Sequence, residues 1–425
     1  MSRSLHLRRV ALRGLVLLAL AASSRHLPAA ADDPSAGASS LQQPRADPSK
    51  DGRVTTLLNQ QAGAARRVGE MQTGNVQGRL QQLHGDDSAL CDRTPPPPKR
   101  VSIAAEAGDP SPGELPSTAM PPLPAPAALS ASTAAAAPVS LPFASCQRTP
   151  LATGWSAGSV EVGAGDAPIG GQGFGFHSKG LTLGADRRVS RQLVLGAGVG
   201  LAHERADLAG DGVSNGADAM SAVVYVGYRP TAALTVDALV GQGELQMRSA
   251  RRLGERTSTA AERPGSQRFA SVAAGYRLGV RGADLAPYTR LDALQSTLRP
   301  YAENDGAADA LQFQRQSAPS LKFAVGIEGS SRIETRYGAL SPRGKLEMRH
   351  ELEAAGSAAI QYVDGASGPS YAVDATAVPR NALSAGFGAN LALRDSWSFG
   401  AGYAVDVANN TRVSRLDLKL TRSLR

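Results

Sequence analysis

Residues 192–201 read QLVLGAGVGL, and this stretch decides which fold the chain can adopt. Its odd-numbered positions carry leucine, alanine or valine, whereas three of its even-numbered positions are Gly196, Gly198 and Gly200. Because successive side chains of a β-strand point to opposite faces, the stretch predicts a strand with one apolar face and one nearly bare face. Such a strand suits the wall of a transmembrane β-barrel, with its apolar face toward lipid and its bare face toward the lumen.

The same period-two pattern recurs through the C-terminal two thirds of the chain. The predicted strand cores lie near 155–164, 172–186, 191–206, 217–229, 232–247, 266–280, 284–298, 321–331, 336–351, 381–393, 396–406 and 412–424. An even number of strands places both ends of a closed barrel on the periplasmic side of an outer membrane. The fold class we predict is therefore all-β, a twelve-stranded antiparallel transmembrane β-barrel.

The connections between these strands give an independent signal, because they alternate between short and long. Short turns are predicted at 228–231, 280–283 and 393–396. Long loops rich in Gly and Asp are predicted at 207–216, 247–265, 299–320 and 352–380. Short periplasmic turns and long extracellular loops are typical of outer-membrane barrels. A soluble β-sandwich is the alternative; it would explain the strands but not the regular alternation of their connections.

Composition excludes a helical membrane protein. Apolar residues make up 42% of the 425 residues but aromatic residues only 4%. After the N-terminus, no stretch approaches the roughly 20 consecutive apolar residues that a membrane helix needs. If the chain crosses a membrane, it must do so as a closed barrel.

The N-terminus has the order of a secretory signal peptide. Three arginines and a histidine lie within residues 1–9, an apolar core (GLVLLALAA) follows at 14–22, and Ala29, Ala30 and Ala31 form a small-residue cleavage site. A short buried helix is the alternative interpretation. We predict export, with a mature chain that begins near Asp32.

Between the signal and the barrel, one stretch has helical periodicity. Its apolar residues recur at intervals of three and four, at Val54, Leu57, Leu58, Ala65, Val68, Met71, Val76, Leu80 and Leu83. Four glycines lower its intrinsic stability by nearly 1 kcal/mol each, so we expect it to need a partner surface. We predict an N-terminal pore helix that crosses the lumen; a frayed helix in solution is the alternative.

The rest of the N-terminal region predicts little ordered structure. The chain is expected to divide into a signal peptide (1–31), a short flexible segment (32–50), the pore helix (51–85), a disordered Pro/Ala-rich linker (86–152) and the barrel (153–425). The two cysteines, Cys91 and Cys146, precede the barrel, and an oxidising compartment would permit one disulfide between them.

The formal charge of +8 would suggest a nucleic-acid partner in a cytosolic protein. For an exported barrel, outer-membrane lipid and lipopolysaccharide are the more suitable anionic partners, and we expect no nucleic acid.

Alternation also predicts which side chains line the pore. The predicted pore-lining residues are Gly196, Gly198, Gly200, Arg290, Asp292, Glu328, Lys345, Glu347, Arg349, Gly386, Gly388, Gly400, Gly402 and Asp406. We expect Glu328, Glu347 and Asp406 to face the pore-helix arginines Arg66, Arg67 and Arg79. Aromatic residues near strand ends, expected on the outer face, are Tyr276, Tyr288, Trp397 and Tyr403.

No motif in the chain predicts catalysis, a metal or a cofactor. His203-Glu204 and His350-Glu351 lack a second histidine at helical spacing, so they do not form the metalloprotease motif. The glycine-rich stretch at 196–200 belongs to a strand with no following helix, so it is not a phosphate-binding loop. A pair of lumen carboxylates could act catalytically, but charged lumen walls are the norm in such barrels.

The barrel region resembles the β-domain of bacterial autotransporters, the translocator barrels of type V secretion. The resemblance is carried by 180–230, 287–294 (PYTRLDAL), 338–352 (GALSPRGKLEMRHEL) and 381–403 (NALSAGFGANLALRDSWSFGAGY). It implies a twelve-stranded, monomeric outer-membrane barrel that holds an upstream helix. It also implies the barrel-assembly machinery and periplasmic chaperones as partners.

The chain departs from the pattern of this family at three points. It ends in Leu424-Arg425 where the family usually ends in an aromatic residue. Its only Asn-Asn pair, Asn409-Asn410, lies in a predicted turn, so no cleavage site is carried over. Little sequence precedes the pore helix, so we expect a translocator barrel with a vestigial or missing passenger. A stand-alone channel, a surface-binding (adhesin-like) barrel and, less favoured, a barrel-rim hydrolase are the alternatives.

Overall fold

The computed structural model describes one α-helix, a short 3₁₀-helix before it and the strands of the barrel region. The described residues are 46–86, 152–165, 174–208, 213–253, 257–280, 282–303, 309–353, 356–364, 368–375, 379–393, 396–409 and 411–424. The expectations for the signal peptide, for most of the flexible segment and the linker, and for Cys91 and Cys146 lie outside these residues.

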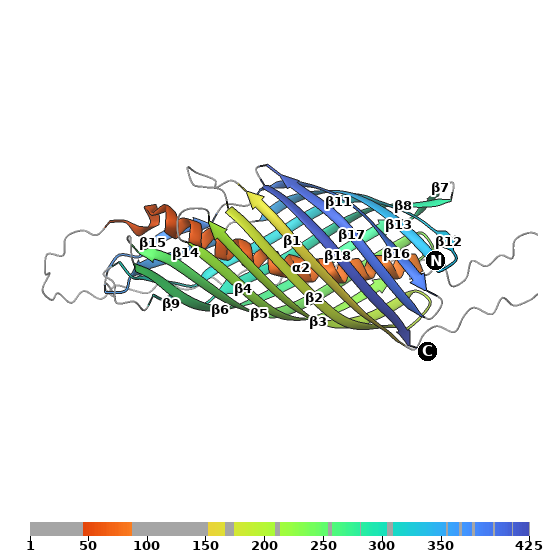
Figure 1. The fold of residues 1–425 in the computed structure, drawn as a ribbon, viewed down its shortest axis with the longest axis horizontal. Coiled ribbons are helices and arrows are strands. Elements are labelled where there is room, and N and C mark those ends of the chain that lie inside the picture. The colour runs from red at the N-terminus through yellow and green to blue at the C-terminus, as the bar shows by residue number, and fades with distance from the viewer. Residues whose placement is uncertain are drawn as a thin grey trace, which may run out of the picture. The chain divides into compact units, whose positions relative to one another are not determined.

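Within the described ranges, twelve long strands form a closed antiparallel barrel (Figure 1). They are β1 (Ala152–Gly165), β2 (Phe174–Arg188), β3 (Leu193–Leu208), β4 (Ser214–Tyr228), β5 (Leu234–Leu253), β6 (Thr257–Tyr276), β8 (Ala283–Leu298), β11 (Gln316–Ser331), β13 (Gly338–Glu353), β16 (Asn381–Leu393), β17 (Trp397–Ala408) and β18 (Thr411–Leu424). Each strand pairs with the next, and β18 pairs with β1 from Ala152 opposite Leu424 to Gly165 opposite Thr411. The predicted strand number and closure are confirmed.

The strands alternate between a buried inner face and an exposed apolar outer face. In β3, Leu195, Val199 and Leu201 point outward and are about half exposed, whereas Val194 and Ala202 point inward and are buried. The outward residues form an apolar belt around the barrel, which suits contact with lipid hydrocarbon.

The two ends of the barrel differ. At one end, called the short-turn end, tight connections join the strands, and β7 (Leu278–Val280) and β12 (Ile333–Thr335) lie there. The opposite end, called the long-loop end, carries four more short strands, of which all but β10 are labelled in Figure 1. They are β9 (Tyr301–Ala302), β10 (Leu311–Phe313), β14 (Gly356–Tyr362) and β15 (Tyr371–Ala375).

Three of the predicted long loops are partly wrong, because paired strands occupy them. β5 and β6 stay paired as far as Leu253 opposite Thr257, so residues 247–253 and 257–265 form the outer part of a long hairpin. The other two predicted loops, 299–320 and 352–380, contain β9, β10, β14 and β15. Beyond the lipid belt the outward side chains become polar, as at Arg248 and Glu262, so the backbone ladder continues where the apolar alternation stops.

A long helix, α2 (Gly52–Asp86), runs through the barrel from the long-loop end to the short-turn end (Figure 1). The Asp51 carboxylate caps its first turn by accepting a 2.9 Å hydrogen bond from the amide of Arg53. A short 3₁₀-helix, η1 (Pro48–Lys50), precedes it. Hydrogen bonds from Ser49 to the Asp47 side chain cap η1 and lower the pKa of that carboxyl. None of the described helices is apolar enough to cross a lipid bilayer by itself.

The apolar stripe of α2 packs against the inner wall at three successive levels. The first level, near the start of the helix, packs Val54, Leu57 and Leu58 against Val213, Leu311, Phe313, Ile360 and Val373. The middle level packs Ala64, Ala65, Val68 and Met71 against Ala202, Ala217, Leu245, Met247 and Leu298. The last level packs Val76, Leu80 and Leu83 against Trp155, Val194, Tyr225, Leu239, Phe269 and Leu294. The helix, whose glycines make it weak in isolation, is therefore stabilised by the wall.

We predict that Leu418→Arg destabilises the barrel by about 2–4 kcal/mol, because Leu418 is 57% exposed on the outer face and a charge there would meet hydrocarbon. Lys419→Leu, one residue along on the lumen-facing side, is the matched control and should have a much smaller effect. Free energies of folding into lipid bilayers, measured by urea titration, give both values. Equal losses for the two variants would contradict the inward and outward assignment.

Candidate functional site

The candidate functional site is the lumen, where α2 lies against one side of the wall. Two arginines of α2 make ion pairs with carboxylates of that side. Arg79 donates to both carboxylate oxygens of Asp186 on β2, at 2.7 and 3.0 Å, and both side chains are nearly fully buried. Arg67 donates to both oxygens of Glu204 on β3 and lies over the Phe176 ring. Bidentate pairs of this kind fix the position and orientation of the guanidinium.

The acidic partners predicted for these arginines are wrong. Glu347 accepts from Arg290 at 2.7 Å and from Lys345 at 3.0 Å. The other two predicted acids also pair with wall cations: Asp406 with Arg349 at 2.7 Å, and Glu328 with Arg343 at 3.8 Å. Arg66 donates to the Pro319 carbonyl. The alternation of the strands indicates which residues face the lumen, but it does not indicate to which side of the lumen the helix packs.

Amide and hydroxyl groups extend the contact between helix and wall. Asn75 donates to the Thr182 hydroxyl at 2.9 Å, and that hydroxyl donates to Gln72 at 2.8 Å. Gln77 donates to Asp292 on β8 at 2.8 Å, and Gln82 donates to the Ser398 hydroxyl on β17 at 3.0 Å. These hydrogen bonds offset part of the cost of burying polar side chains between the helix and the wall.

Inward glycines of β3 make room for large side chains. A Cβ at Gly200 would overlap the Gln72 amide of α2. A Cβ at Gly196 would overlap the Tyr225 ring, and one at Gly198 would press on the carbonyl of Leu183. The first of these glycines therefore permits the close approach of the helix, whereas the other two permit packing within the wall.

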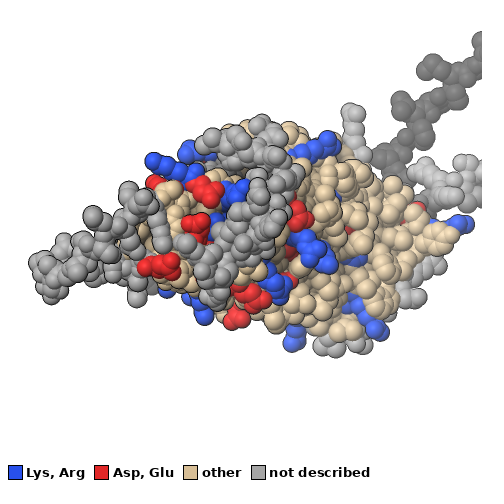
Figure 2. All heavy atoms as spheres, turned by 60° about the vertical axis from the view of Figure 1, so that its left-hand side comes forward, with Lys and Arg blue, Asp and Glu red and all other residues tan. Residues whose placement is uncertain are grey.

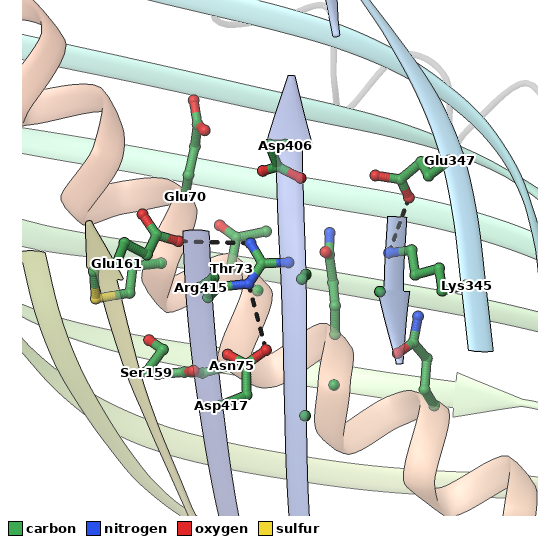
Figure 3. Close-up of a pocket in the computed structure, with 18 of the residues that line it drawn as sticks. Glu70, Thr73, Asn75, Ser159, Glu161, Lys345, Glu347, Asp406, Arg415 and Asp417 are labelled. Carbon is green, nitrogen blue, oxygen red and sulfur yellow. Dashed lines mark ion pairs between the residues drawn. The ribbon is translucent and has the colours of Figure 1, made fainter. Parts of the chain in front are cut away.

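On the other side of α2 a cavity of about 240 Å³ separates the helix from the wall (Figure 3). The remaining predicted pore-lining residues all line it: Arg290, Asp292, Glu328, Lys345, Glu347, Arg349, Gly386, Gly388, Gly400, Gly402 and Asp406. Gly196, Gly198 and Gly200 are not among its lining residues, because they lie on β3, on the side where α2 packs.

Charges of both signs alternate around this cavity. Figure 3 shows Glu161 and Asp417 on either side of Arg415, at 3.5 and 3.4 Å from its guanidinium. Lys345 points toward Glu347, which lies two residues further along the same strand, β13. Among the described residues, no group of His, Cys, Asp or Glu side chains is arranged to hold a metal ion. The arrangement is that of a charged, ion-paired lumen.

Tyr288, expected on the outer face, points into the lumen and donates from its hydroxyl to Glu347 at 2.5 Å. Its strand, β8, places even-numbered residues inward, as Arg290 on the same strand shows. Tyr288 therefore belongs to the lumen charge network and not to an aromatic girdle. The sequence did contain a signal for this position: Tyr288 lies two residues before Arg290, so the strand period places both side chains on the same face.

The long-loop end encloses the first turns of α2. Arg263, almost fully buried, donates to Gln61 of α2 at 2.7 Å and to Gln316 at 2.8 Å. Its guanidinium lies over the Tyr301 ring, which stacks on Phe313. The strands β9, β10, β14 and β15 thus contribute to a cap around the start of the helix.

The short-turn end fixes the C-terminus of α2. Arg229 donates to the carbonyl of His84 at 2.9 Å, and Arg277 donates to the same carbonyl. The His84 ring lies 2.8 Å from Asp237 of β5. Cations near the C-terminus of a helix donate hydrogen bonds to its free carbonyls and are attracted by the negative end of its dipole. Five partners of the helix were not predicted from the sequence: Asp186, Glu204, Arg229, Arg263 and Arg277. The strand period does place Asp186 and Glu204 on the inward face of their strands.

Comparison with known proteins identifies the barrel. The family described as "Autotransporter beta-domain" matches residues 154–404. Among solved structures, the translocator domain of the autotransporter NalP from Neisseria meningitidis is similar, with a TM-score of 0.54 at 14% identity, covering 64% of this chain and 88% of that one. The transport unit of the autotransporter AIDA-I from Escherichia coli has a TM-score of 0.50 at 14% identity, covering 66% and 92%. No curated protein sequence is significantly similar to the chain.

At such identities the two solved structures show the fold alone, and the family assignment depends on the sequence match. That match covers more than half of the 425 residues and includes almost every strand of the barrel. The chain therefore belongs to the autotransporter β-domain family, and its barrel is an outer-membrane translocator barrel.

Proposed function

We propose that this barrel exports the segment that precedes α2 and that α2 then stays in the lumen as a seal. The direction of the helix carries the proposal. Residues 46–51, the described residues before α2, lie at the long-loop end, whereas α2 ends at the short-turn end beside Arg229 and Arg277. If the short turns face the periplasm, as is usual for such barrels, the chain upstream of the helix is outside the cell.

Contacts at the long-loop end support this direction. Tyr362 of β14 donates to the Ala46 carbonyl at 2.8 Å, so the described residues just before η1 lie beside β14. The apolar belt supports contact with outer-membrane lipid and lipopolysaccharide, and insertion would use periplasmic chaperones and the barrel-assembly machinery. Leu424 points outward near the end of β18, where these barrels usually carry an aromatic residue.

A stand-alone channel is the second candidate, and the cavity beside α2 favours it. The two functions make different demands on the helix. A translocator needs α2 to seal the pore after export, whereas a channel needs the native chain to conduct.

The first prediction from this proposal concerns the seal. Deleting 51–84 should raise single-channel conductance in planar bilayers while the barrel stays folded, because the wall is hydrogen-bonded independently of α2. A deletion of equal length between α2 and β1, 101–134, is the control and should leave conductance low. High conductance of the undeleted chain would favour the channel, and unchanged conductance after the 51–84 deletion would show that α2 does not seal the pore.

The second prediction concerns how α2 is held. Arg79→Met leaves Asp186 buried without its cation and should destabilise the folded protein by about 3–5 kcal/mol. Adding Asp186→Leu should recover most of that loss, because the unpaired charge is then removed. Arg332→Met breaks an exposed pair with Glu334 and should cost at most about 1 kcal/mol. Urea unfolding in micelles measures all three; equal losses for Arg79→Met and Arg332→Met would exclude the buried pair as an anchor.

The third prediction tests export itself. A peptide tag inserted after Asp33 should be accessible to antibody on intact cells, because it precedes α2. A tag inserted between Ser190 and Arg191, in the short turn after β2, is the matched control and should become accessible only after the outer membrane is permeabilised. A tag after Asp33 that stays hidden on intact cells would contradict export of the upstream segment.

A further inference from the structure

A groove of about 900 Å³ crosses the outside of the barrel over β18, β1 and β2 to β6. Its outward side chains follow two neighbouring cross-strand rows of the sheet. The first row is Leu416, Val160, Lys179, His203, Asp218, Gln246 and Pro264. The second row is Leu418, Gly158, Leu181, Leu201, Met220, Glu244 and Ser266. Because strands of such barrels are tilted by about 35–45° from the axis, a groove across them is inclined to the membrane plane.

The polarity of the groove changes along its length. At the β18 end it is lined by Leu416, Leu418 and Val160, all about half exposed. At the β6 end it is lined by Glu244, Gln246 and Ser266, with Arg299 at its edge. One end therefore lies within the apolar belt and the other beyond it, which matches the two parts of a lipid molecule.

The edge of the apolar belt passes through the middle of the groove. On β3 the outward residues are apolar up to Leu201 and polar from His203 and Arg205 onward. On β4 the same change occurs between Met220 and Asp218. Figure 2 shows that charged side chains gather toward the end of the barrel that carries β14 and β15, with a mostly uncharged wall behind them.

At this edge the charges are unbalanced. Asp218 is already paired with His203 at 2.7 Å and with Arg248, which also approaches Glu262. Of the charged residues that line the groove, Lys179 and Arg299 have no ion-pair partner among the described residues, and Glu244 is the one lining acid without such a partner. Arg205 and Asp207, the next two outward residues after His203 on β3, lie just outside the groove and are likewise unpaired within the described part of the chain. Within the groove, two unpaired cations against one unpaired anion leave a positive excess where the groove leaves the belt, next to Arg205.

We propose that this groove binds a phosphate-bearing glycolipid of the outer leaflet, of the lipopolysaccharide class. Its acyl chain lies along Leu416, Leu418, Leu181 and Leu201, and its phosphate lies between Lys179 and Arg205. Lysine and arginine form strong charge-assisted hydrogen bonds with phosphate oxygens, more so at the edge of a low-dielectric layer. A lipid without an anionic headgroup would cover the apolar end but leave these cations uncompensated. The proposal depends on the orientation under Proposed function, in which the long-loop end faces outward.

The test uses the full chain in micelles of an uncharged detergent, with binding counted by native mass spectrometry. The probe is a diphosphorylated glucosamine-disaccharide lipid. Lys179→Glu combined with Arg205→Glu should weaken its binding by about tenfold or more, since a tenfold change corresponds to about 1.4 kcal/mol. Arg412→Glu, an outward and exposed charge reversal on β18 outside the groove, is the matched control and should leave affinity unchanged.

A second pair of variants tests the apolar end without changing charge. Leu201→Trp fills the groove and should weaken binding, whereas Leu346→Trp, on the outward face of β13 and similarly exposed, should not. Heat-dependent mobility in SDS shows which variants keep the folded barrel. Because Leu201→Trp keeps every charge, it also tests the proposal if the charge reversals do not fold.

Three results would overturn the proposal. They are equal binding of the dephosphorylated lipid, equal weakening by Arg412→Glu, and full competition by inorganic phosphate, which would indicate an ion site and not a lipid site. Failure of export would be distinguishable, because the tag after Asp33 would then stay hidden while the purified barrel still bound the lipid.

Discussion

The structure depends on one constraint, which is that no backbone amide or carbonyl can remain unpaired in lipid hydrocarbon. The antiparallel ladder between β1 and β18, from Ala152 opposite Leu424 to Gly165 opposite Thr411, satisfies it by removing the last two edges of the sheet. Closure then fixes the environment of every side chain, because each strand has one face toward lipid and one toward a lumen. The outer face has to be apolar, and the inner face is free to be small or charged.

That freedom of the inner face is what makes α2 stable. A helix with four internal glycines and two buried arginines, Arg66 and Arg79, could neither stand alone nor sit in hydrocarbon. In the lumen, Gly200 of β3 leaves room for the Gln72 side chain of the helix, and Asp186 and Glu204 compensate Arg79 and Arg67. Since buried ion pairs add little net stability against their desolvation, we interpret these pairs as fixing the position of the helix, while the apolar stripe supplies the stabilisation.

The sequence was sufficient for the twelve strands, for their inward and outward faces apart from Tyr288, and for the existence of the helix. Each of these follows from a local period, two for strands and 3.6 for the helix, that any stretch displays without knowledge of the rest. Loops were less predictable. The hairpin beyond Met247 has polar residues on its outward face, so its strands lost the apolar signal although their backbone remained paired.

The pairing of charges could not be predicted in the same way. The lumen presents more than a dozen ionisable side chains to the helix, and the strand period gives no angular position for α2 among them. Glu347 was a reasonable candidate for an arginine of α2, but Arg290 and Lys345 on the wall lie closer to it. The helix packs toward β2 to β6 because its apolar stripe contacts Ala202, Leu245 and Phe269 there. The ion pairs of Arg67 and Arg79 with that side of the wall follow from this packing.

The two ends of α2 are held by different chemistry, and this difference gives the helix a fixed axial position. Sliding toward the short-turn end would pull Leu57 and Leu58 out of the apolar cap that contains Phe313. Sliding toward the long-loop end would break the hydrogen bonds from Arg229 and Arg277 to the last turn. Intermediate positions would leave Asp186 without Arg79. The helix can therefore withstand a pull on the chain from outside without opening the pore, which is the mechanical property that a seal behind an exported segment requires.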